Sequence, residues 1–282
     1  MNFSLHHNLR LLYRNSARKL VELIIVCAKL NVREIYYQQN GILKATDESS
    51  GELWFIDTIL PLLVSDINRP VFLDVGANVG HYSLKLVRSI PTCHCYALEP
   101  NPITFIHLAD NCKHKGITPL PYGAGSKKET SVIYSCETSA ATEHASLYQN
   151  VLTDFHRHEN TVEYSCFIAT IDSLVENGLI QESCIHFLKI DTEGHEFECL
   201  KGATRLLSSS SLVAIQFEFN EMNVISRTYL KDFYDLLGSD WSFFRLDTSR
   251  LIPLGAYDSA NEIFKFNNIV ALRKHVLQRI GL

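Results

Sequence analysis

The sequence lacks an excess of positive charge, because its 282 residues include 26 lysines and arginines against 31 aspartates and glutamates. A formal net charge of −5 leaves no broad cationic surface for a phosphate backbone, so we expect no nucleic-acid partner. A long apolar run is also lacking. The run 23–28 is far shorter than the ~20 residues that a membrane helix needs, so we expect no integral membrane segment.

Cysteine pairs of the CxxC type, the usual signature of zinc and redox sites, are absent although the chain holds eight cysteines. Several of these cysteines, such as Cys95, Cys166 and Cys184, lie in or beside apolar, strand-like runs. A reduced cysteine acts there as a small apolar side chain. We therefore expect a reducing, cytoplasmic environment and no metal site.

The first 50 residues predict a helical arm that precedes the main domain. Basic residues, namely Arg10, Arg14, Arg18 and Lys19, come before the apolar run 23–28, and both kinds recur at roughly helical spacing. A helix packed on the domain or on a partner subunit is the favoured interpretation, and a membrane-surface helix is the alternative. The polar stretch 40–51 indicates the boundary, so we expect an arm over 1–50 and one domain over 51–282.

Apolar strands alternate with helices beyond this boundary, which predicts a doubly wound α/β sheet. The predicted strands are 71–75, 95–99, 118–123, 184–191, 212–219, 241–245 and 268–273. Helices are predicted at 82–90, 102–114, from 170 to 176, and at 193–207. Right-handed crossovers place the loops after parallel strands at one edge of the sheet, where ligands bind. Four acids lie at or near such strand ends: Asp74, Glu99, Asp191 and Glu218.

Residues 126–168 break this alternation and predict an insertion that covers the site. Two strand-like segments, 131–134 and 162–168, flank a polar loop. The loop carries Ser146, Tyr148 and the three histidines His144, His156 and His158. Because specificity usually resides in surface loops, we expect this insertion to shape the pocket for the substrate.

A glycine loop follows the first strand, with Gly76 and Gly80 on either side of Asn78. Such a loop lets backbone approach a ligand while the next helix points its N-terminus at it. Asn78 stands where the GxGxxG motif has its middle glycine, which argues against a dinucleotide pyrophosphate. Asp74 is placed to bind an amino group or to order the loop. A tight turn without a ligand is the alternative interpretation.

Acids at the next strand ends have functional and structural interpretations. Glu99 follows Asp74 by 25 residues, the position at which an acid binds a ribose diol in a βαβ unit. Lys189 and Asp191 share one strand face, so an ion pair alone would explain the lysine. Glu193 and Glu196 open a helix, where the helix dipole also favours acids. For Glu193 and Glu196, a structural role and a functional role are equally favoured.

Five segments in order, FLDVGANVGHYSL, YALEPNP, TIDSL, FLKIDTEGHEFECLKGA and QFEFNE, resemble the FkbM family of methyltransferases over residues 52–273. The resemblance implies a Rossmann-like class I methyltransferase fold, so we expect a mostly parallel sheet of seven strands with helices on both faces. It also implies S-adenosylmethionine as the methyl donor. The expected acceptor is a hydroxyl of a sugar, a glycan or a related small molecule.

The resemblance also assigns site residues. The expected donor-binding set is Asp74, Gly76, Asn78, Gly80, Glu99, Asn101, Ser126 and Asp191. The family often has an acid that contacts adenine where this chain has Gly125-Ser126, so a backbone contact is expected there instead. Lys189, Asp191, Glu193 and Glu196 match the family signature. From the chemistry of the reaction, and not from the resemblance, we expect Asp191 to accept the hydroxyl proton or to orient the hydroxyl, with His195 or Glu193 assisting.

Three alternatives stay open at this stage. A metal ion held by Asp191, Glu193 or Glu218 would activate the hydroxyl in place of a base. A catalytically inactive binding protein would keep the fold and bind the donor without turnover. A nicotinamide-dependent oxidoreductase would use a similar sheet, although Asn78 argues against it. A homo-oligomer is one expectation for the assembly of the chain.

Overall fold

The computed structural model describes residues 16–46, 48–136, 145–157, 160–181 and 184–281. Contacts divide the chain into two units, Met1–Asn40 and Gly41–Leu282. The described part of the first unit is helical, with a helix over 16–27 and α2 (Val32–Gln39), which Asn31 caps. No residue of α2 is buried. The helical character predicted for the arm is therefore confirmed for residues 16–27 and 32–39.

Residues 41–46 and 48–50 belong to the larger unit. Ile42 is fully buried, and the Leu43 N–H donates to the Phe266 carbonyl at 2.8 Å. The domain boundary after residue 50 stays a prediction. Within the described residues, no helix has the length and apolar character required to cross a membrane.

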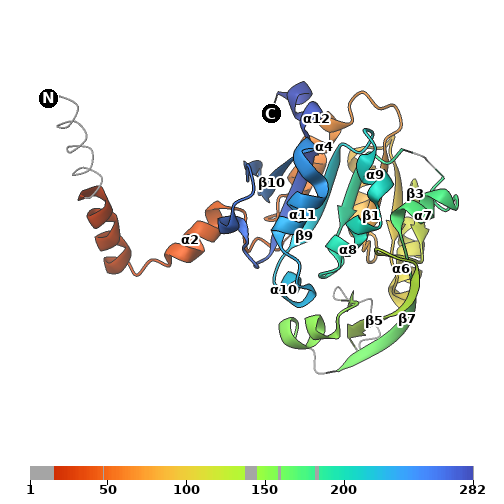
Figure 1. Cartoon of the computed structure of the whole chain (residues 1–282), viewed down its shortest axis with the longest axis horizontal. Coiled ribbons are helices and arrows are strands. Elements are labelled where there is room, and N and C mark those ends of the chain that lie inside the picture. Colours follow the sequence, from red (N-terminus) through yellow and green to blue (C-terminus); the bar gives the residue numbers. More distant parts are fainter. Residues whose placement is uncertain (1–15, 47, 137–144, 158–159, 182–183, 282) are drawn as a thin grey trace. The chain divides into compact units, whose positions relative to one another are not determined.

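One twisted sheet forms the centre of the larger unit (Figure 1). Its strand order is β11 (Arg250–Pro253), β10 (Trp241–Asp247), β12 (Asn267–Arg273), β9 (Ala214–Phe219), β8 (Phe187–Ile190), β1 (Val71–Val75), β2 (His94–Leu98) and β3 (Ile117–Leu120). The strands from β9 to β3 pair in parallel, and β12 is antiparallel to both of its neighbours. The order reverses between β1 and β8, as in Rossmann-like sheets, so the predicted α/β fold is confirmed.

The prediction of seven strands is wrong by one, because β11 adds an eighth strand at the edge through a hairpin with β10. This strand has no buried residue, begins with an exposed arginine and ends in Pro253. Proline is tolerated in such an edge strand, since its missing N–H faces no neighbour. Without an apolar run or a clean alternation, β11 carries no strand signal in the sequence.

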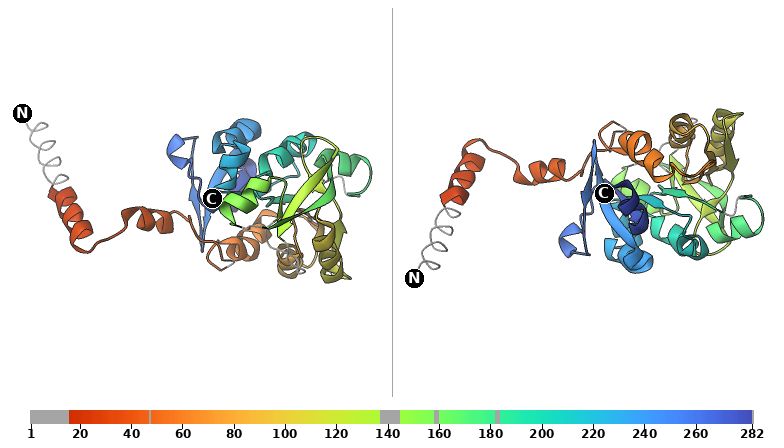
Figure 2. Two further views of the ribbon diagram at one scale, coloured as in Figure 1. Left: turned by 90° about the horizontal axis from the view of Figure 1, so that it is seen from below. Right: turned by 90° about the horizontal axis from the view of Figure 1, so that it is seen from above.

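Helices cover both faces of this sheet, as predicted (Figure 2). Residues 71, 73 and 75 of β1 point into one apolar core together with α7 (Ile171–Glu176), α8 (Glu196–Lys201), α9 (Thr204–Ser208) and α11 (Leu230–Leu237). Phe72 points into the other core, with α4 (Leu60–Leu63), α5 (His81–Ser89), α6 (Pro102–Cys112) and α12 (Lys274–Ile280). Burial on both faces explains why the central strands are apolar without alternation.

Helices shorter than predicted surround the sheet. The predicted helix 193–207 is in fact α8 and α9, which separate at Gly202, where a β-carbon would lie 2.0 Å from the Gly125 carbonyl oxygen. The chain before β1 forms α3 (Glu52–Trp54) and a π-helical turn η1 (Phe55–Ile59) that continues into α4. The turns η3 (Gly238–Asp240) and η4 (Ser259–Asn261) flank the last strands, and α10 (Met222–Ser226) follows β9.

The insertion forms a second, smaller sheet, which confirms its separation from the main alternation. Its order is β4 (Gly123–Ala124), β7 (Thr161–Ala169), β5 (Glu129–Cys136) and β6 (Ala145–Ser146). A π-helical turn η2 (Val151–Phe155) precedes β7. Figure 1 shows β5 and β7 beyond the end of the main sheet, on the side where α10 lies.

Candidate functional site

The loop between β1 and α5 has three residues with positive φ: Gly76 at +79°, Asn78 at +51° and Gly80 at +90°. A β-carbon on Gly76 would lie 1.8 Å from the carbonyl oxygen of Asp191, so this loop passes against the chain that leaves β8. A β-carbon on Gly80 would lie 2.8 Å from Leu108 Cδ1 of α6. The absence of a side chain at Gly76 thus lets the loop pass close to the chain that leaves β8. At Gly80 it lets α6 pack against the start of α5.

Glu99 leaves the end of β2 and is almost completely buried. Its Oε2 accepts the Asn78 N–H at 3.0 Å and its Oε1 accepts the Asn101 N–H at 2.8 Å. Burial raises the pKa of Glu99 to about 7, although both hydrogen bonds act in the opposite direction. Asn101 itself caps α6, since its Oδ1 accepts the N–H of Ile103 at 3.0 Å.

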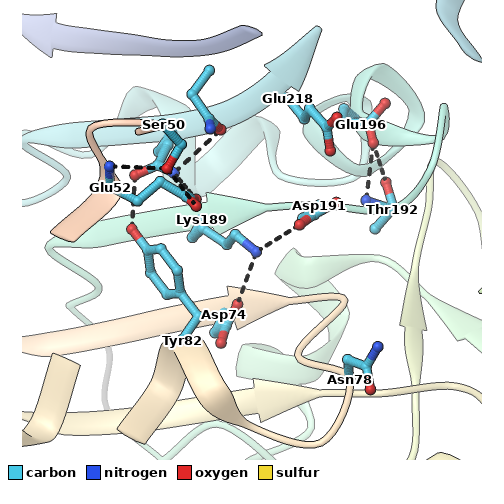
Figure 3. A network of polar contacts seen from close by, with 12 residues as sticks. Ser50, Glu52, Asp74, Asn78, Tyr82, Lys189, Asp191, Thr192, Glu196 and Glu218 are labelled. Atoms are coloured by element: carbon cyan, nitrogen blue, oxygen red, sulfur yellow. Dashed lines mark hydrogen bonds and ion pairs between the residues drawn. The ribbon is translucent and has the colours of Figure 1, made fainter. Parts of the chain in front are cut away.

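Lys189 lies buried in β8 between two acids, as Figure 3 shows. Its Nζ is 3.0 Å from Asp191 Oδ2 and 4.0 Å from Asp74 Oδ1. Burial opposes its charge, but Asp191 and Asp74 keep the pKa of Lys189 above the ordinary value. The predicted ion pair is confirmed. Burial raises the pKa of Asp74, whose Oδ2 accepts the Ser83 hydroxyl at 2.6 Å.

Behind this ion pair lies a set of polar residues that the sequence analysis missed (Figure 3). The Tyr82 hydroxyl donates to Gln216 Oε1 at 2.7 Å, and Gln216 Nε2 donates to Glu52 Oε1 at 2.7 Å. The Tyr82 ring centroid is 4.7 Å from Lys189 Nζ. Gln216 in an otherwise apolar strand was the available signal. Glu52 lies in a short helix far before that strand, and nothing in the sequence connects the two.

The loop after β8 is fixed by Glu196. Its Oε1 accepts the N–H of Thr192 at 2.9 Å and the N–H of Gly194 at 3.1 Å. Burial raises the pKa of Glu196 to about 7, and no hydrogen bond reaches its Oε2 within the described structure. Glu193 between these donors adopts φ +54°, a rare conformation for a side chain other than glycine. Glu196 therefore supports the loop that carries Asp191 and Glu193.

The insertion contacts this loop through three side chains. Ser146 Oγ donates to the Glu193 carbonyl at 3.0 Å, and His156 Nε2 lies 3.5 Å from Glu193 Oε2. The Tyr148 hydroxyl is 3.1 Å from His195 Nδ1. Burial lowers the pKa of both histidines. His144 and His158, which the sequence analysis also placed in the insertion, lie outside the described residues.

A cavity of about 450 Å³ opens between the rim of the sheet and the insertion. Six of the residues predicted for the site line it: Gly76, Asn78, Glu99, Asp191, Glu193 and His195. The remaining four lie outside its lining: Asp74, Gly80, Asn101 and Ser126. Near the insertion the wall is formed by Gly123 and Ala124, whereas the Ser126 side chain forms a hydrogen bond with Glu198.

The cavity is acidic. Glu99, Asp191, Glu193 and Glu218 line it, and its described lining includes no lysine or arginine. Burial and the neighbouring Asp191 raise the pKa of Glu193 to about 8 and that of Glu218 well above its ordinary value. In the part of the chain that the structure describes, no three histidine, cysteine, aspartate or glutamate side chains are arranged to hold a metal ion.

Two comparisons with known sequences both lead to methyltransferases. The family model of the methyltransferase FkbM domain matches residues 74–239, more than half of the chain. A relative, the hexuronic acid methyltransferase AglP of Haloferax volcanii, is 32% identical over 188 residues, which are 61% of this chain and 68% of the relative.

Solved structures are similar only at a distance. An O-methyltransferase from Bacillus cereus in complex with SAH is 14% identical, with a TM-score of 0.42 over 92% of this chain and 91% of that one. A structure described as a putative O-methyltransferase from Klebsiella pneumoniae is 12% identical, with a TM-score of 0.43 over 90% and 94% of the two chains.

Proposed function

The chain belongs to the FkbM methyltransferase family, and we propose that it transfers the methyl group of S-adenosylmethionine to a hydroxyl of a sugar or glycan. Membership in the family makes it a methyltransferase that depends on S-adenosylmethionine. The chemical nature of the acceptor is the part that we propose. A relative that acts on a hexuronic acid supports a sugar acceptor.

The residues at the rim fit S-adenosylmethionine. Gly76 has no room for a side chain, because a β-carbon there would overlap the Asp191 carbonyl, so backbone lines this part of the cavity. The acids of the wall suit a ligand that carries a sulfonium and an ammonium group. Glu99 accepts one backbone N–H at each oxygen, which leaves a second lone pair on each for the two hydroxyls of a ribose.

The assignment of the remaining donor contacts follows from the lining. We propose that adenine is held by the wall of Gly123 and Ala124, which lie directly before Gly125-Ser126, where other family members often have an acid. Three residues outside the lining have supporting roles in this proposal. Asp74 lies beside Lys189, Gly80 allows α6 to pack closely, and Asn101 caps α6. For Ser126 the lining supports an indirect role through Glu198.

One observation carries the proposed reaction: Asp191 stands on the cavity wall with its side chain 37% exposed, while buried Lys189 holds it from behind. S-adenosylmethionine supplies a methyl group on a positively charged sulfur. The acceptor oxygen attacks the methyl carbon as the carbon–sulfur bond breaks, and its proton passes to a carboxylate oxygen of Asp191. Lys189 fixes that carboxylate, which serves the alignment that an in-line displacement needs.

Glu193 and His195 take supporting roles in this proposal. Each is bound to the insertion, through Ser146 and His156 in one case and through Tyr148 in the other. We propose that these contacts close the cavity over the acceptor and exclude water from it.

Product analysis tests the proposal. The purified protein is incubated with methyl-labelled S-adenosylmethionine and a panel of monosaccharides and glycans, and the product is examined by NMR. A methyl ether on a ring or chain hydroxyl, stable to mild alkali, is the expected product. An alkali-labile methyl ester, a methylated amine, or no labelled sugar despite donor binding would contradict it.

A further inference from the structure

The charges of the cavity wall also restrict the charge that a sugar acceptor can carry. Four carboxyl groups line the space, of which Glu193 and Glu218 have a raised pKa, and the described lining contains no lysine or arginine. The stretches 137–144 and 158–159 of the insertion contain no lysine or arginine in the sequence either. Any negative charge on the acceptor would therefore meet carboxylates without a basic side chain of the wall to balance it.

The positive charge of Lys189, which is buried next to this wall, is already paired with carboxylates. Lys189 lies behind the lining, with Asp191 at 3.0 Å and Asp74 at 4.0 Å. Its single charge faces two carboxylates, so it has none left for an anionic ligand. Burial, and after it the neighbouring Asp191, already raise the pKa of Glu193 to about 8. A further negative charge in the cavity would therefore be opposed by burial and by the carboxylates already present.

The two histidines of the wall do not supply positive charge near neutral pH. Burial lowers the pKa of His195 despite Glu198 and Glu129, and its Nδ1 contacts the Tyr148 hydroxyl. Burial also lowers the pKa of His156 despite Glu221, and its Nε2 lies 3.5 Å from Glu193 Oε2. Both are therefore neutral at pH 8 and act as hydrogen-bonding groups.

Glu193 is held in this position by its surroundings. It keeps φ +54° while Ser146 binds its carbonyl oxygen and His156 lies beside its carboxylate. A residue persists in such a conformation only where its neighbours determine it. With 16% of its side chain exposed, the carboxylate faces the cavity at the junction of rim and insertion.

We propose that the acceptor is an uncharged, hydroxyl-rich sugar and that Glu193 is a specificity-determining residue against uronic acids. This inference rests on the proposed function. Hydroxyl groups donate to the carboxylates of the wall, whereas Leu147, Met222 and Phe266 cover the C–H face of the ring. The chain thereby differs from AglP, which acts on a hexuronic acid.

Matched acceptor pairs test this in the full-length protein. Methyl glucoside is compared with methyl glucuronide, and methyl galactoside with methyl galacturonoside, at pH 8 and saturating S-adenosylmethionine. Release of S-adenosylhomocysteine gives kcat/KM. The neutral member should be favoured by at least about tenfold, since juxtaposed like charges are strongly unfavourable. Equal or better use of the acidic members overturns the inference but leaves sugar methylation intact. No methylation of any sugar overturns the proposed function as well.

Two variants test whether Glu193 is responsible for the preference for neutral sugars. Because the pKa of Glu193 is about 8, Glu193→Gln removes a carboxyl group that is about half ionised at pH 8, and it should reduce the preference for the neutral sugar several-fold. Glu163→Gln makes the same chemical change at an exposed position of β7 outside the cavity and should leave the preference unchanged. Thermal melting and S-adenosylmethionine binding verify that both variants fold. An unchanged preference in folded Glu193→Gln refutes the role of Glu193.

Discussion

Replacing Glu196 by glutamine should stabilise the protein at alkaline pH, although this removes the carboxyl group that supports the loop carrying Asp191 and Glu193. Glu196 is 1% exposed, and one of its oxygens has no hydrogen-bond partner in the described structure. Its other oxygen accepts the N–H groups of Thr192 and Gly194. Glutamine can retain those bonds through its own Oε1, with an uncharged group in place of the unpaired oxygen.

The magnitude follows from the pKa. Burial raises the pKa of Glu196 from 4.5 to about 7, and each pH unit of difference corresponds to about 1.4 kcal/mol. Between these two pH values the folded protein binds a proton that the unfolded chain has released, so the free energy of unfolding falls as pH rises. Above pH 7 the ionised carboxylate costs the folded protein about 3 kcal/mol relative to its protonated form. Glutamine has no such cost.

Urea unfolding of wild type and Glu196→Gln at pH 5 and pH 8 measures the effect. The variant should match wild type at pH 5 and exceed it by up to about 3 kcal/mol at pH 8. Glu198→Gln is the control, since hydrogen bonds from Lys201 and Ser126 outweigh burial and lower the pKa of Glu198. That variant should gain no stability at pH 8. The reasoning fails if Glu196→Gln is less stable than wild type at pH 8, or if their difference is the same at both pH values.

Three further substitutions and one titration test the site. Asp191→Asn should lower kcat by about 10² to 10⁴ with donor affinity changed less than about threefold, and equal turnover would refute its role as base. Glu99→Ala should weaken calorimetric binding of S-adenosylmethionine by at least about tenfold, whereas wild type should not bind NAD(H). Gly76→Ala should abolish donor binding or folding, because its β-carbon would overlap the Asp191 carbonyl. Donor binding at pH 7.5 should release protons as its positive charge lowers the pKa of Glu193 and Glu99, so binding enthalpies should differ between buffers of different ionisation enthalpy.

The central strands could be predicted because burial on both faces leaves a direct trace in the sequence. Residues 71–75 form β1 as predicted, since a short, mostly apolar run before a glycine loop is typical of a strand buried on both faces. The elements that were missed or misjudged depend on tertiary contacts. Arg250–Pro253 pairs only because the hairpin brings it beside β10, and the helix predicted over 193–207 is interrupted where Gly202 approaches Gly125.

The site residues that could be predicted are those at the ends of the parallel strands. Asp191 and Glu99 line the cavity because carboxyl ends of parallel strands meet at one edge. Asp74 and Asn101 were also assigned to the donor, yet the structure places them behind the wall, where one faces Lys189 and the other caps a helix. Sequence position indicates the edge but not the direction of a side chain within a packed layer. Glu52 escaped detection because its contact with β9 spans 164 residues.

The excess of buried acids is itself an argument for a ligand. Structure alone would require at most one carboxylate for Lys189, yet Asp74 and Asp191 both approach it, while Glu193 and Glu218 add further buried carboxyl groups nearby. Each raised carboxyl pKa means that the folded protein loses stability as that group ionises. A fold under no functional constraint would gain by replacing such groups with apolar ones. The arrangement is consistent with a cavity that completes its charge balance only when a positively charged donor and a hydroxyl-bearing acceptor are bound, and this is the chemistry that methyl transfer from a sulfonium requires.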